Sequence, residues 1–503
     1  MLDVKRNLTT MTDFYELTMS AGYLDEGYVD KIAVFDMFFR RVPDGGGYAV
    51  MAGLQQFIDA VDHLEFTDED IEYLRSTKAF DEKFLTYLKN FQLHCNIWAI
   101  EEGMPIFPQE PIVTVEGPAI ECQLLETLLL VTFNHQCLIA TKANRIVRSA
   151  AGRPVMEFGA RRAQGYDAAY FGARASYIGG CGSTSCVMAA RDFGIPASGT
   201  MAHSWVQMFP TEYDAFKKYA EMYPDACVLL VDTYNIEEAV KTAVEVAGPE
   251  LGGVRIDSGD LAAMAQRVRN QLDALGATNT TITVTNDLDE YALAALQTAP
   301  VDSYGVGTML VTGSGAPTCA MVYKLTEREG ADGTMVPVMK KSKDKATVPG
   351  RKLAFRSYEY ALAEAEHVIS GSEEKLAGFT PEPTWKNLLV DFVDHGHIDA
   401  QWQGHDAIMA ARRLPRQGVV RTAHHRAEPH EGRASDSYGD SGSLTRTFRL
   451  HRNPSQHSCS PYLRTAHWAV RFNGSTDRDQ SPAGRISLAA SLWLHWLLFP
   501  LDE

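Results

Sequence analysis

The middle of the chain repeats one pattern: a short apolar run followed at once by glycine or polar residues. Runs that end near residues 158, 231, 256, 284 and 306 lead into the stretches GARR, DT, DSGD, TND and GT. Helical segments separate many of them at roughly 25–30 residue intervals, as in a parallel sheet with crossover helices. Because the apolar strands end in polar clusters, the pattern predicts a closed (β/α) barrel with its active site at that face. An open doubly wound sheet is the alternative.

The individual elements follow from the same pattern. We expect strands of this region at residues 155–158, 199–204, 227–231, 253–256, 281–284, 304–306 and 320–324, with helices at 211–222, 236–246, 261–275 and 288–296. The first part of the chain lacks this alternation and is typical of an α+β arrangement. There we expect a strand at 33–39, helices at 54–61 and 67–76, and a long helix from about 120 to 150.

Charge and composition exclude several classes of protein. The formal net charge of −17 argues against a broad nucleic-acid surface. The apolar region 124–140 contains Glu126 and His135, so it predicts a buried helix rather than a membrane span. The N-terminus lacks the apolar run of a signal peptide, and the eight cysteines match no zinc or redox spacing. We therefore expect a cytoplasmic protein that binds neither nucleic acid nor a membrane.

Three glycine-rich or polar stretches favour a phosphorylated ligand. The stretches 305–308 and 313–315 supply backbone N–H groups with little bulk, and 257–260 opens a helix at Leu261. The stretch 198–205 places Thr200 and His203 on small-residue backbone, where an imidazole can transfer protons or phosphoryl groups. Walker A and dinucleotide fingerprints are absent from the sequence, and no motif predicts a protein-bound metal.

Four stretches, in this order, resemble motifs of the nicotinate phosphoribosyltransferase family: TDFYELTM (12–19), EFGARR (157–162), GTMAHS (199–204) and VRIDSGDL (254–261). The resemblance covers roughly residues 5 to 410. It implies the type II phosphoribosyltransferase fold, an irregular (β/α) barrel with an α/β (α+β-like) domain built from both chain ends. The domains expected are then 1–120, 121–335 as the barrel, and 336–411 packing back on the first. A homodimer is also implied, with the N-terminal part of one subunit closing the site of the other.

The resemblance further implies a reaction. Nicotinate and phosphoribosyl pyrophosphate give nicotinate mononucleotide and pyrophosphate, with coupled ATP hydrolysis, as the first step of NAD salvage from nicotinate. ATP is then a co-substrate, and Mg²⁺ accompanies phosphoribosyl pyrophosphate. By motif match, His203 is the histidine that ATP phosphorylates.

Roles for the remaining residues follow from the same match. Tyr15 and Phe158 are expected to stack on the base, and Arg255, with Thr200 nearby, is expected to bind the nicotinate carboxylate. The leaving pyrophosphate needs cations, for which the candidates are Arg40, Arg161 and Arg255. The alternative for Arg161 and Arg162 is a solvated loop pair, and the functional role is favoured for Arg161 because it stands closer to the strand end. Asp257 is expected to bind ribose hydroxyls or orient an arginine. The 5′-phosphate is assigned to Gly305, Gly307 and Thr308.

Other functions remain as alternatives. A nicotinamide-selecting site gains from a carboxylate that would repel nicotinate, and the stretch 179–186 contains no acidic residue, which favours the acid substrate. A Schiff-base aldolase needs a lysine at a strand end inside the barrel, for which only Lys324 qualifies. A catalytically impaired phosphosugar-binding barrel is the third alternative.

The composition changes after about residue 410. From Arg412 onward arginine, histidine and serine are frequent and lysine is absent, since the last lysine is Lys386. One interpretation is a disordered basic tail. The other, which the loss of lysine favours, is an out-of-frame translation of the true C-terminus. Residues 412–503 are therefore predicted to be an atypical tail.

Overall fold

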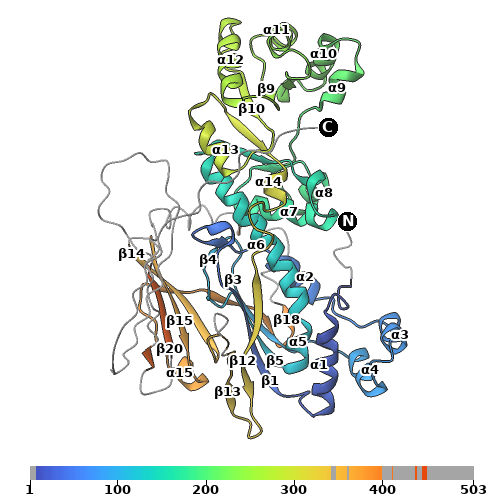
Figure 1. Ribbon diagram of the computed structural model, residues 1–503, viewed down its shortest axis with the longest axis vertical. Coiled ribbons are helices and arrows are strands. Elements are labelled where there is room, and N and C mark those ends of the chain that lie inside the picture. The colour runs from blue at the N-terminus through green and yellow to red at the C-terminus, as the bar shows by residue number, and fades with distance from the viewer. Residues whose placement is uncertain are drawn as a thin grey trace, which may run out of the picture.

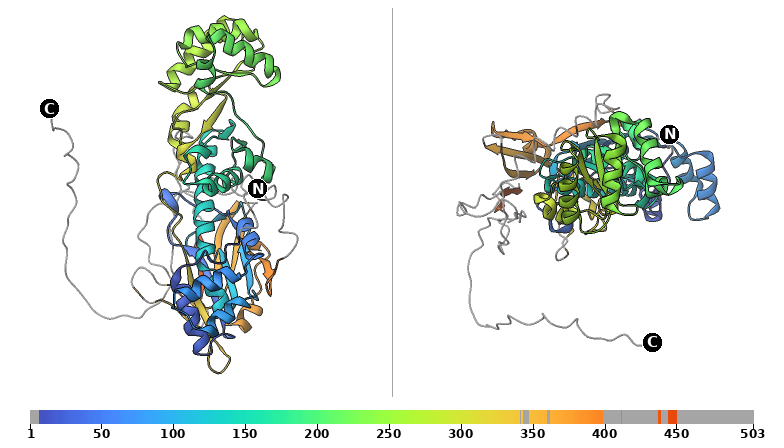
Figure 2. Two further views of the ribbon diagram at one scale, coloured as in Figure 1. Left: turned by 90° about the vertical axis from the view of Figure 1, so that its right-hand side faces the viewer. Right: turned by 90° about the horizontal axis from the view of Figure 1, so that it is seen from above.

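The computed structural model describes residues 7–340, 342, 347–359, 362–398, 411, 437–438 and 444–449. The described molecule is elongated, with an antiparallel sheet in its lower half and a parallel sheet in its upper half (Figures 1 and 2). Two large hydrophobic clusters correspond to these halves, one under each sheet. The mixed α/β architecture expected from the sequence is thus present.

The antiparallel sheet joins segments from distant parts of the chain. Its central strand β1 (Ile32–Phe39) lies between β5 (Val113–Pro118) and β12 (Met321–Glu329). The order is β13-β12-β1-β5-β3-β17-β18, where the other strands are β3 (Asn96–Ile100), β13 (Met335–Pro337), β17 (Leu389–Asp394) and β18 (His397–Ile398). All but the first residue of β1 are buried, which is why its sequence, IAVFDMFF, is almost wholly apolar.

Helix α2 (Leu54–Val61) and the short antiparallel pair β2 (Ala49–Val50) and β4 (Pro105–Ile106) share the hydrophobic cluster of this sheet. Helices α1 (Phe14–Asp25), α3 (Asp68–Ser76) and α4 (Glu82–Lys89) pack together in a separate cluster. The helix predicted at 54–61 is confirmed, and so is the acidic one at 67–76, because Thr67 caps α3 through a capping box with Asp70.

The upper sheet is parallel throughout, in the order β7-β6-β11-β10-β9-β8. Its strands are β6 (Val155–Glu157), β7 (Ser183–Thr184), β8 (Val228–Leu230), β9 (Gly253–Ile256), β10 (Thr281–Val284) and β11 (Ser303–Val306). The connecting helices are α7 (Tyr166–Gly179), α8 (Val187–Phe193), α9 (His203–Met208), α10 (Glu212–Met222), α11 (Ile236–Ala247), α12 (Leu261–Ala274), α13 (Glu290–Ala295) and α14 (Thr308–Val311). Among the described residues these strands do not form the closed barrel that the strand pattern predicted, because β7 and β8 do not pair with each other. A single bridge, Thr184 to Ala197, extends the β7 edge, so the barrel is irregular and open.

Two strand predictions were wrong. Residues 199–202 form no strand and His203 begins α9, since Met201 alone of this stretch is buried and no alternating apolar face exists to pair. The strand at 320–324 forms, but as β12 in the antiparallel sheet, where Tyr323 stacks on Phe35 with ring centroids 4.7 Å apart. An apolar run does not reveal which sheet it joins. The short strand β7 was missed.

A long helical run lies between the two halves (Figure 1). It comprises α5 (Ala119–Leu124) and α6 (Glu126–Ser149), as predicted from the apolar region. By length and composition it could cross a membrane, but 67% of its most apolar window is buried inside the structure. Its apolar surface is therefore used in packing both hydrophobic clusters, as expected of a core helix.

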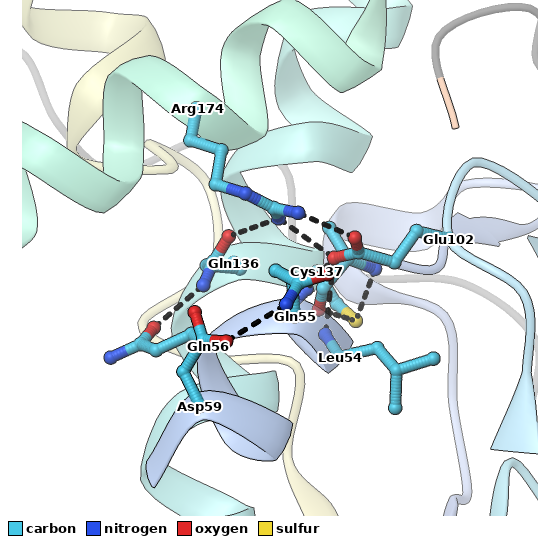
Figure 3. Close-up of polar contacts among 10 residues, drawn as sticks. Leu54, Gln55, Gln56, Asp59, Glu102, Gln136, Cys137 and Arg174 are labelled. Atoms are coloured by element: carbon cyan, nitrogen blue, oxygen red, sulfur yellow. Dashed lines mark hydrogen bonds and ion pairs between the residues drawn. The ribbon is translucent and has the colours of Figure 1, made fainter. Parts of the chain in front are cut away.

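A buried ion pair between Arg174 and Glu102 joins the two halves beside this helix (Figure 3). The Arg174 guanidinium on α7 donates to both carboxylate oxygens of Glu102, at 2.7 and 2.6 Å, and to Gln136 Oε1 on α6 at 3.1 Å. Glu102 also accepts the backbone N–H groups of Gly53 and Leu54 at the start of α2. Each charge at this junction is thus hydrogen-bonded on several sides.

The remaining described strands belong to a third sheet, in the order β16-β14-β15-β20-β19. They are β14 (Lys352–Glu359), β15 (Leu362–Ser370), β16 (Trp385–Asn387), β19 (Ser437–Tyr438) and β20 (Leu444–Arg449), with α15 at Glu373–Ala377. The domain boundaries stay predictions. Apart from β19 and β20, the tail predicted at 412–503 lies outside the described residues.

Candidate active site

Two cavities lie at the carboxyl ends of the parallel strands and share Phe158, Arg161, Arg255 and Asp257 in their walls. The larger, of about 550 Å³, is also lined by Ala160, Ser185, Gly199, Thr200, Met201, Ala202, His203 and Ser204. The smaller, of about 220 Å³, is also lined by Arg162, Thr285, Asn286, Asp287, Gly305, Gly307 and Thr308. The strand-end clusters noted in the sequence therefore converge, because parallel strands present all their carboxyl ends at one face.

His203 lies in the wall of the larger cavity with its side chain 39% exposed. Its Nδ1 is 3.1 Å from the Thr233 hydroxyl. Its Nε2 faces two carboxylates, at 4.0 Å from Asp232 Oδ1 and 3.8 Å from Asp257 Oδ2. The imidazole is thus held between a hydroxyl and a pair of acids, and it remains open to the cavity.

Asp232 follows strand β8, and its side chain is only 1% exposed. Oδ2 accepts the backbone N–H of Asp257 at 2.8 Å and the Ser258 hydroxyl at 2.6 Å, which ties the ends of β8 and β9 together. Oδ1, the oxygen nearest His203, is buried and has no hydrogen-bond partner in the described part of the chain. Asp232 was noted at a strand end but was not predicted as a site residue. Its place directly after an apolar strand was the available signal.

Arg255 projects from β9 towards the same space. Burial lowers the pKa of its guanidinium, and the neighbouring Asp257 and Asp232 carboxylates partly offset that. Its Nη1 donates to the Thr200 hydroxyl, whereas its Nε is buried without a hydrogen-bond partner among the described residues. The structure therefore brings together Arg255, Thr200 and Asp257, three of the predicted site residues.

The smaller cavity is shaped by the strand ends of β10 and β11. A side chain at Gly305 would meet both the Phe158 ring and the Thr285 methyl group at 2.6 Å, so only glycine fits there. Asn286 and Asp287 both have positive φ, 97° and 41°, in the left-handed region that non-glycine residues rarely adopt. Thr285, Asn286 and Asp287 were recorded only as a polar cluster and were missed as cavity residues.

Both arginines of the EFGARR stretch line these cavities. Arg161 and Arg162 lie in the short 3₁₀ turn Ala160–Arg162 and are exposed. Arg161 borders both cavities, and Arg162 borders the smaller one. Arg162 was not among the predicted site residues, yet the tight turn keeps both side chains at the cavity wall.

Two predicted residues lie elsewhere in the chain. Tyr15 is on α1, in the lower half of the molecule, is 44% exposed and belongs to neither cavity wall (Figure 1). Burial of its hydroxyl and the nearby Glu126 carboxylate raise the pKa of Tyr15. Arg40 follows β1 and lies over the Phe38 ring, 5.3 Å from its centroid. A single chain therefore does not bring Tyr15 to Phe158, because the two residues belong to different halves of the molecule.

Of the three stretches expected to bind an anion, 313–315 lies apart from the cavities, and 257–260 reaches them through Asp257 alone. Asp260 caps α12 with its own carboxylate by accepting the N–H of Ala263, which places a negative charge where the anion was expected. A side chain at Gly315 would meet the Asp44 carboxylate at 2.5 Å, so the 313–315 turn serves close packing instead. Stretch 305–308 contributes Gly305, Gly307 and Thr308 to the wall of the smaller cavity.

The site can accept a cation that arrives with its own ligands. Asp257 and Asp287 line the cavities with carboxylates, but within the described residues no group of three or more His, Cys, Asp or Glu side chains could hold a metal. Mg²⁺ commonly takes one or two protein carboxylates and completes its shell with phosphate oxygens and water. The residues present therefore fit a phosphate-borne Mg²⁺.

Comparison with known protein families agrees with the motifs. The model of the nicotinate phosphoribosyltransferase N-terminal domain matches residues 10–134, and the model of the nicotinate phosphoribosyltransferase family matches residues 154–351.

The chain belongs to the nicotinate phosphoribosyltransferase family. Nicotinate phosphoribosyltransferase pncB1 of Mycobacterium tuberculosis is 45% identical over 354 residues, which cover 69% of this chain and 77% of that protein. The Bacillus subtilis nicotinate phosphoribosyltransferase is 44% identical over 361 residues, covering 70% and 73%.

Two solved structures have a similar fold. The human nicotinic acid phosphoribosyltransferase superposes with a TM-score of 0.70 at 28% identity, covering 82% of this chain and 94% of that one. A nicotinate-nucleotide pyrophosphorylase from Pyrococcus furiosus superposes with a TM-score of 0.67 at 24% identity, covering 83% and 96%. The type II phosphoribosyltransferase fold expected from the motifs is thereby confirmed.

Proposed function

We propose that this phosphoribosyltransferase joins nicotinate to phosphoribosyl pyrophosphate, and that ATP hydrolysis is coupled to the reaction through phosphorylation of His203. The products are nicotinate mononucleotide and pyrophosphate, the first step of NAD salvage from nicotinate. The observation that carries the proposal is the shared wall of the two cavities, which contains Arg255 and Asp257, with His203 3.8 Å from Asp257 in the larger cavity.

The base and the sugar take the space around Arg255. Its guanidinium binds the nicotinate carboxylate, Thr200 holds that guanidinium in place, and the exposed face of Phe158 supports the flat ring. The nicotinate nitrogen forms a bond to C1 of the ribose while the bond from C1 to the pyrophosphate oxygen breaks, and the electron pair leaves with pyrophosphate. Since the transition state is oxocarbenium-like, positioning and charge supply most of the catalysis.

The phosphates take the more cationic side of the site. Gly305, Gly307 and Thr308 leave room for the 5′-phosphate close to the backbone, and Arg161 with Arg162 faces the leaving pyrophosphate. Mg²⁺, when bound with the substrate, neutralises the charge that builds up on that leaving group.

The surroundings of His203 determine which nitrogen reacts. Carboxylates beside Nε2 favour the tautomer with the proton on Nε2, so Nδ1 carries the lone pair, which attacks in place of its contact with the Thr233 hydroxyl. A bond forms from Nδ1 to the γ-phosphorus of ATP while the bond to the leaving ADP oxygen breaks, and water later hydrolyses the phosphohistidine. Asp232 and Asp257 then stabilise the protonated ring without taking its proton.

A second copy of the chain supplies the groups that one chain keeps apart. On α1 and just before it, Met11, Phe14, Tyr15 and Met19 are between 38% and 54% exposed, an apolar surface suited to a subunit interface. In the homodimer we propose, Tyr15 and Arg40 of one subunit complete the cavity of the other, with Tyr15 stacking opposite Phe158.

The test is direct. Purified protein with nicotinate, phosphoribosyl pyrophosphate, Mg²⁺ and ATP should form nicotinate mononucleotide and ADP. The His203→Ala variant should still form the mononucleotide but lose its stimulation by ATP and the acid-labile phosphate label from γ-labelled ATP. Retained ATP stimulation in that variant rules out the phosphohistidine, whereas failure of the wild type to form the mononucleotide rules out the reaction itself.

A further inference from the structure

Glu157 is the last residue of β6 and directly precedes Phe158 of the cavity walls, but it is not itself part of them. The residue is 1% exposed. Oε1 accepts the backbone N–H of Gly159, and Oε2 accepts the Thr184 hydroxyl at 2.5 Å. Both carboxylate oxygens therefore accept hydrogen bonds from the protein. One buried group therefore joins the loop that follows β6 to strand β7.

The Gly159 contact fixes the arginine turn. Gly159 accepts the N–H of Arg162 through its carbonyl at 2.7 Å, which closes the 3₁₀ turn carrying Arg161. Position 159 has no space for a side chain, since a Cβ there would meet the Val311 side chain at 2.6 Å and the Gly307 carbonyl at 2.8 Å. Glu157 thus sets the point from which both arginines enter the cavities.

The Thr184 contact extends to the opposite wall. Thr184 accepts the N–H of Ser198 at 3.0 Å, forms the bridge to Ala197, and so anchors the segment that leads to Thr200 and His203. Its hydroxyl also accepts the N–H of Cys186 at 3.0 Å, which fixes the direction of its proton towards Glu157. The next residue, Ser185, lines the larger cavity.

We infer that Glu157 is a positioning residue for the transferase reaction, holding the Arg161 turn and the Thr200–His203 segment at the spacing that the substrates require. It touches no substrate. Burial raises the pKa of its carboxyl, and the hydrogen bonds from Thr184 and Gly159 oppose that rise. This inference rests on the proposed reaction, so its test also measures substrate binding separately from turnover.

The test compares two substitutions at Thr184. Thr184→Val removes the hydroxyl and keeps the shape, and Thr184→Ser keeps the hydroxyl. The loss of a hydrogen bond to a buried carboxylate predicts a roughly ten- to hundredfold rise in KM for phosphoribosyl pyrophosphate in Thr184→Val. We expect kcat to change much less, and Thr184→Ser to restore KM. Glu157→Gln should act like Thr184→Val, because an amide oxygen accepts only one of the two bonds.

Thr132→Val is the matched control. Thr132 is equally buried, its hydroxyl bonds to the Leu128 carbonyl at 2.8 Å, and it belongs to neither cavity wall. If Thr184→Val and Thr132→Val lower the melting temperature alike and leave KM unchanged, Glu157 is structural only and the inference is overturned. Calorimetric titration with phosphoribosyl pyrophosphate reports the binding defect even if turnover is absent, so a failure of the proposed reaction remains distinguishable.

Discussion

The junction between the two halves of the molecule and the candidate active site each contain an arginine, and the contacts of these two arginines differ. Arg174 at the junction is 1% exposed and donates to Glu102 and Gln136, so its hydrogen-bonding capacity is used inside the protein (Figure 3). Arg255 in the site donates to Thr200, and its Nε has no partner among the described residues. Near Arg255, Asp232 Oδ1 is also buried and without a partner there. The junction contributes stability, whereas the site keeps donors and acceptors available for a ligand.

The largest effect is expected from breaking the junction. Arg174→Ala leaves the Glu102 carboxylate buried without its partner, which should lower the free energy of unfolding by about 3–5 kcal/mol. Urea unfolding followed by circular dichroism measures this. A loss well below about 1 kcal/mol would contradict the view that this ion pair holds the two halves together.

Arg255→Ala should impair the reaction and leave the free energy of unfolding nearly unchanged, the opposite of Arg174→Ala. Loss of a guanidinium that binds the substrate carboxylate should lower kcat/KM for nicotinate by about a hundredfold or more, equivalent to roughly 3 kcal/mol. The free energy of unfolding should change little, because Arg255 makes few bonds inside the protein. Steady-state kinetics and urea unfolding of the same preparation separate the two effects. Strong destabilisation with normal kinetics would make Arg255 a structural residue like Arg174.

Replacing two serines by aspartate tests the part of the site that should bind nicotinate. Ser185 lines the larger cavity, whereas Ser183 is 8% exposed and shares a hydrogen bond of 2.6 Å with Ser198. Ser185→Asp places a carboxylate near the nicotinate carboxylate and should raise KM for nicotinate about tenfold. Ser183→Asp should mainly lower stability. Unchanged nicotinate kinetics in both variants would remove the argument that the lack of acidic residues here selects the acid substrate.

The smallest effect is expected from replacing Glu110, which lies beside a third buried arginine, Arg356. Arg356 on β14 donates to Glu366 at 2.5 Å, while Glu110 lies close by, and both carboxyls are buried. Burial raises the pKa of Glu110 well above its usual range, with Glu366 adding to the rise and Arg356 opposing it. Two buried acids thus face one cation, and the raised pKa of Glu110 favours its protonated form in the folded protein.

The direction of the pH effect follows from that proton. A carboxyl whose folded pKa is raised contributes stability that is fully present below its unfolded pKa of about 4.3 and falls as pH rises towards the folded pKa. Glu110→Gln removes this loss, so the variant should gain about 1 kcal/mol on the wild type at pH 8 relative to pH 5. Melting temperatures at the two pH values measure it. Parallel pH profiles for both proteins would mean that Glu110 holds no proton.

Much of the upper half was predictable from local pattern. Strands β9 and β10 have the predicted bounds, and β6, β8 and β11 differ by one or two residues, because apolar runs between turn signals specify buried parallel strands. The convergence of Arg161, Arg255, Asp257 and Gly305 at one face followed from strand polarity alone. Thr200 and His203 were placed on the right segment, although that segment is a loop and a helix start rather than a strand.

The family, the order of the βα units and most side chains around the cavities could be identified from the amino-acid sequence. They could be identified because they depend on short motifs and on the spacing of apolar residues. The tertiary structure alone decided that β12 pairs with β1 across the chain, that Asp232 approaches His203, and that Glu157 links two loops. It also decided that Asp260 caps its own helix and that Tyr15 lies away from Phe158. Such contacts join residues far apart in sequence or depend on a side chain's direction, and neither leaves a periodic signal in the chain.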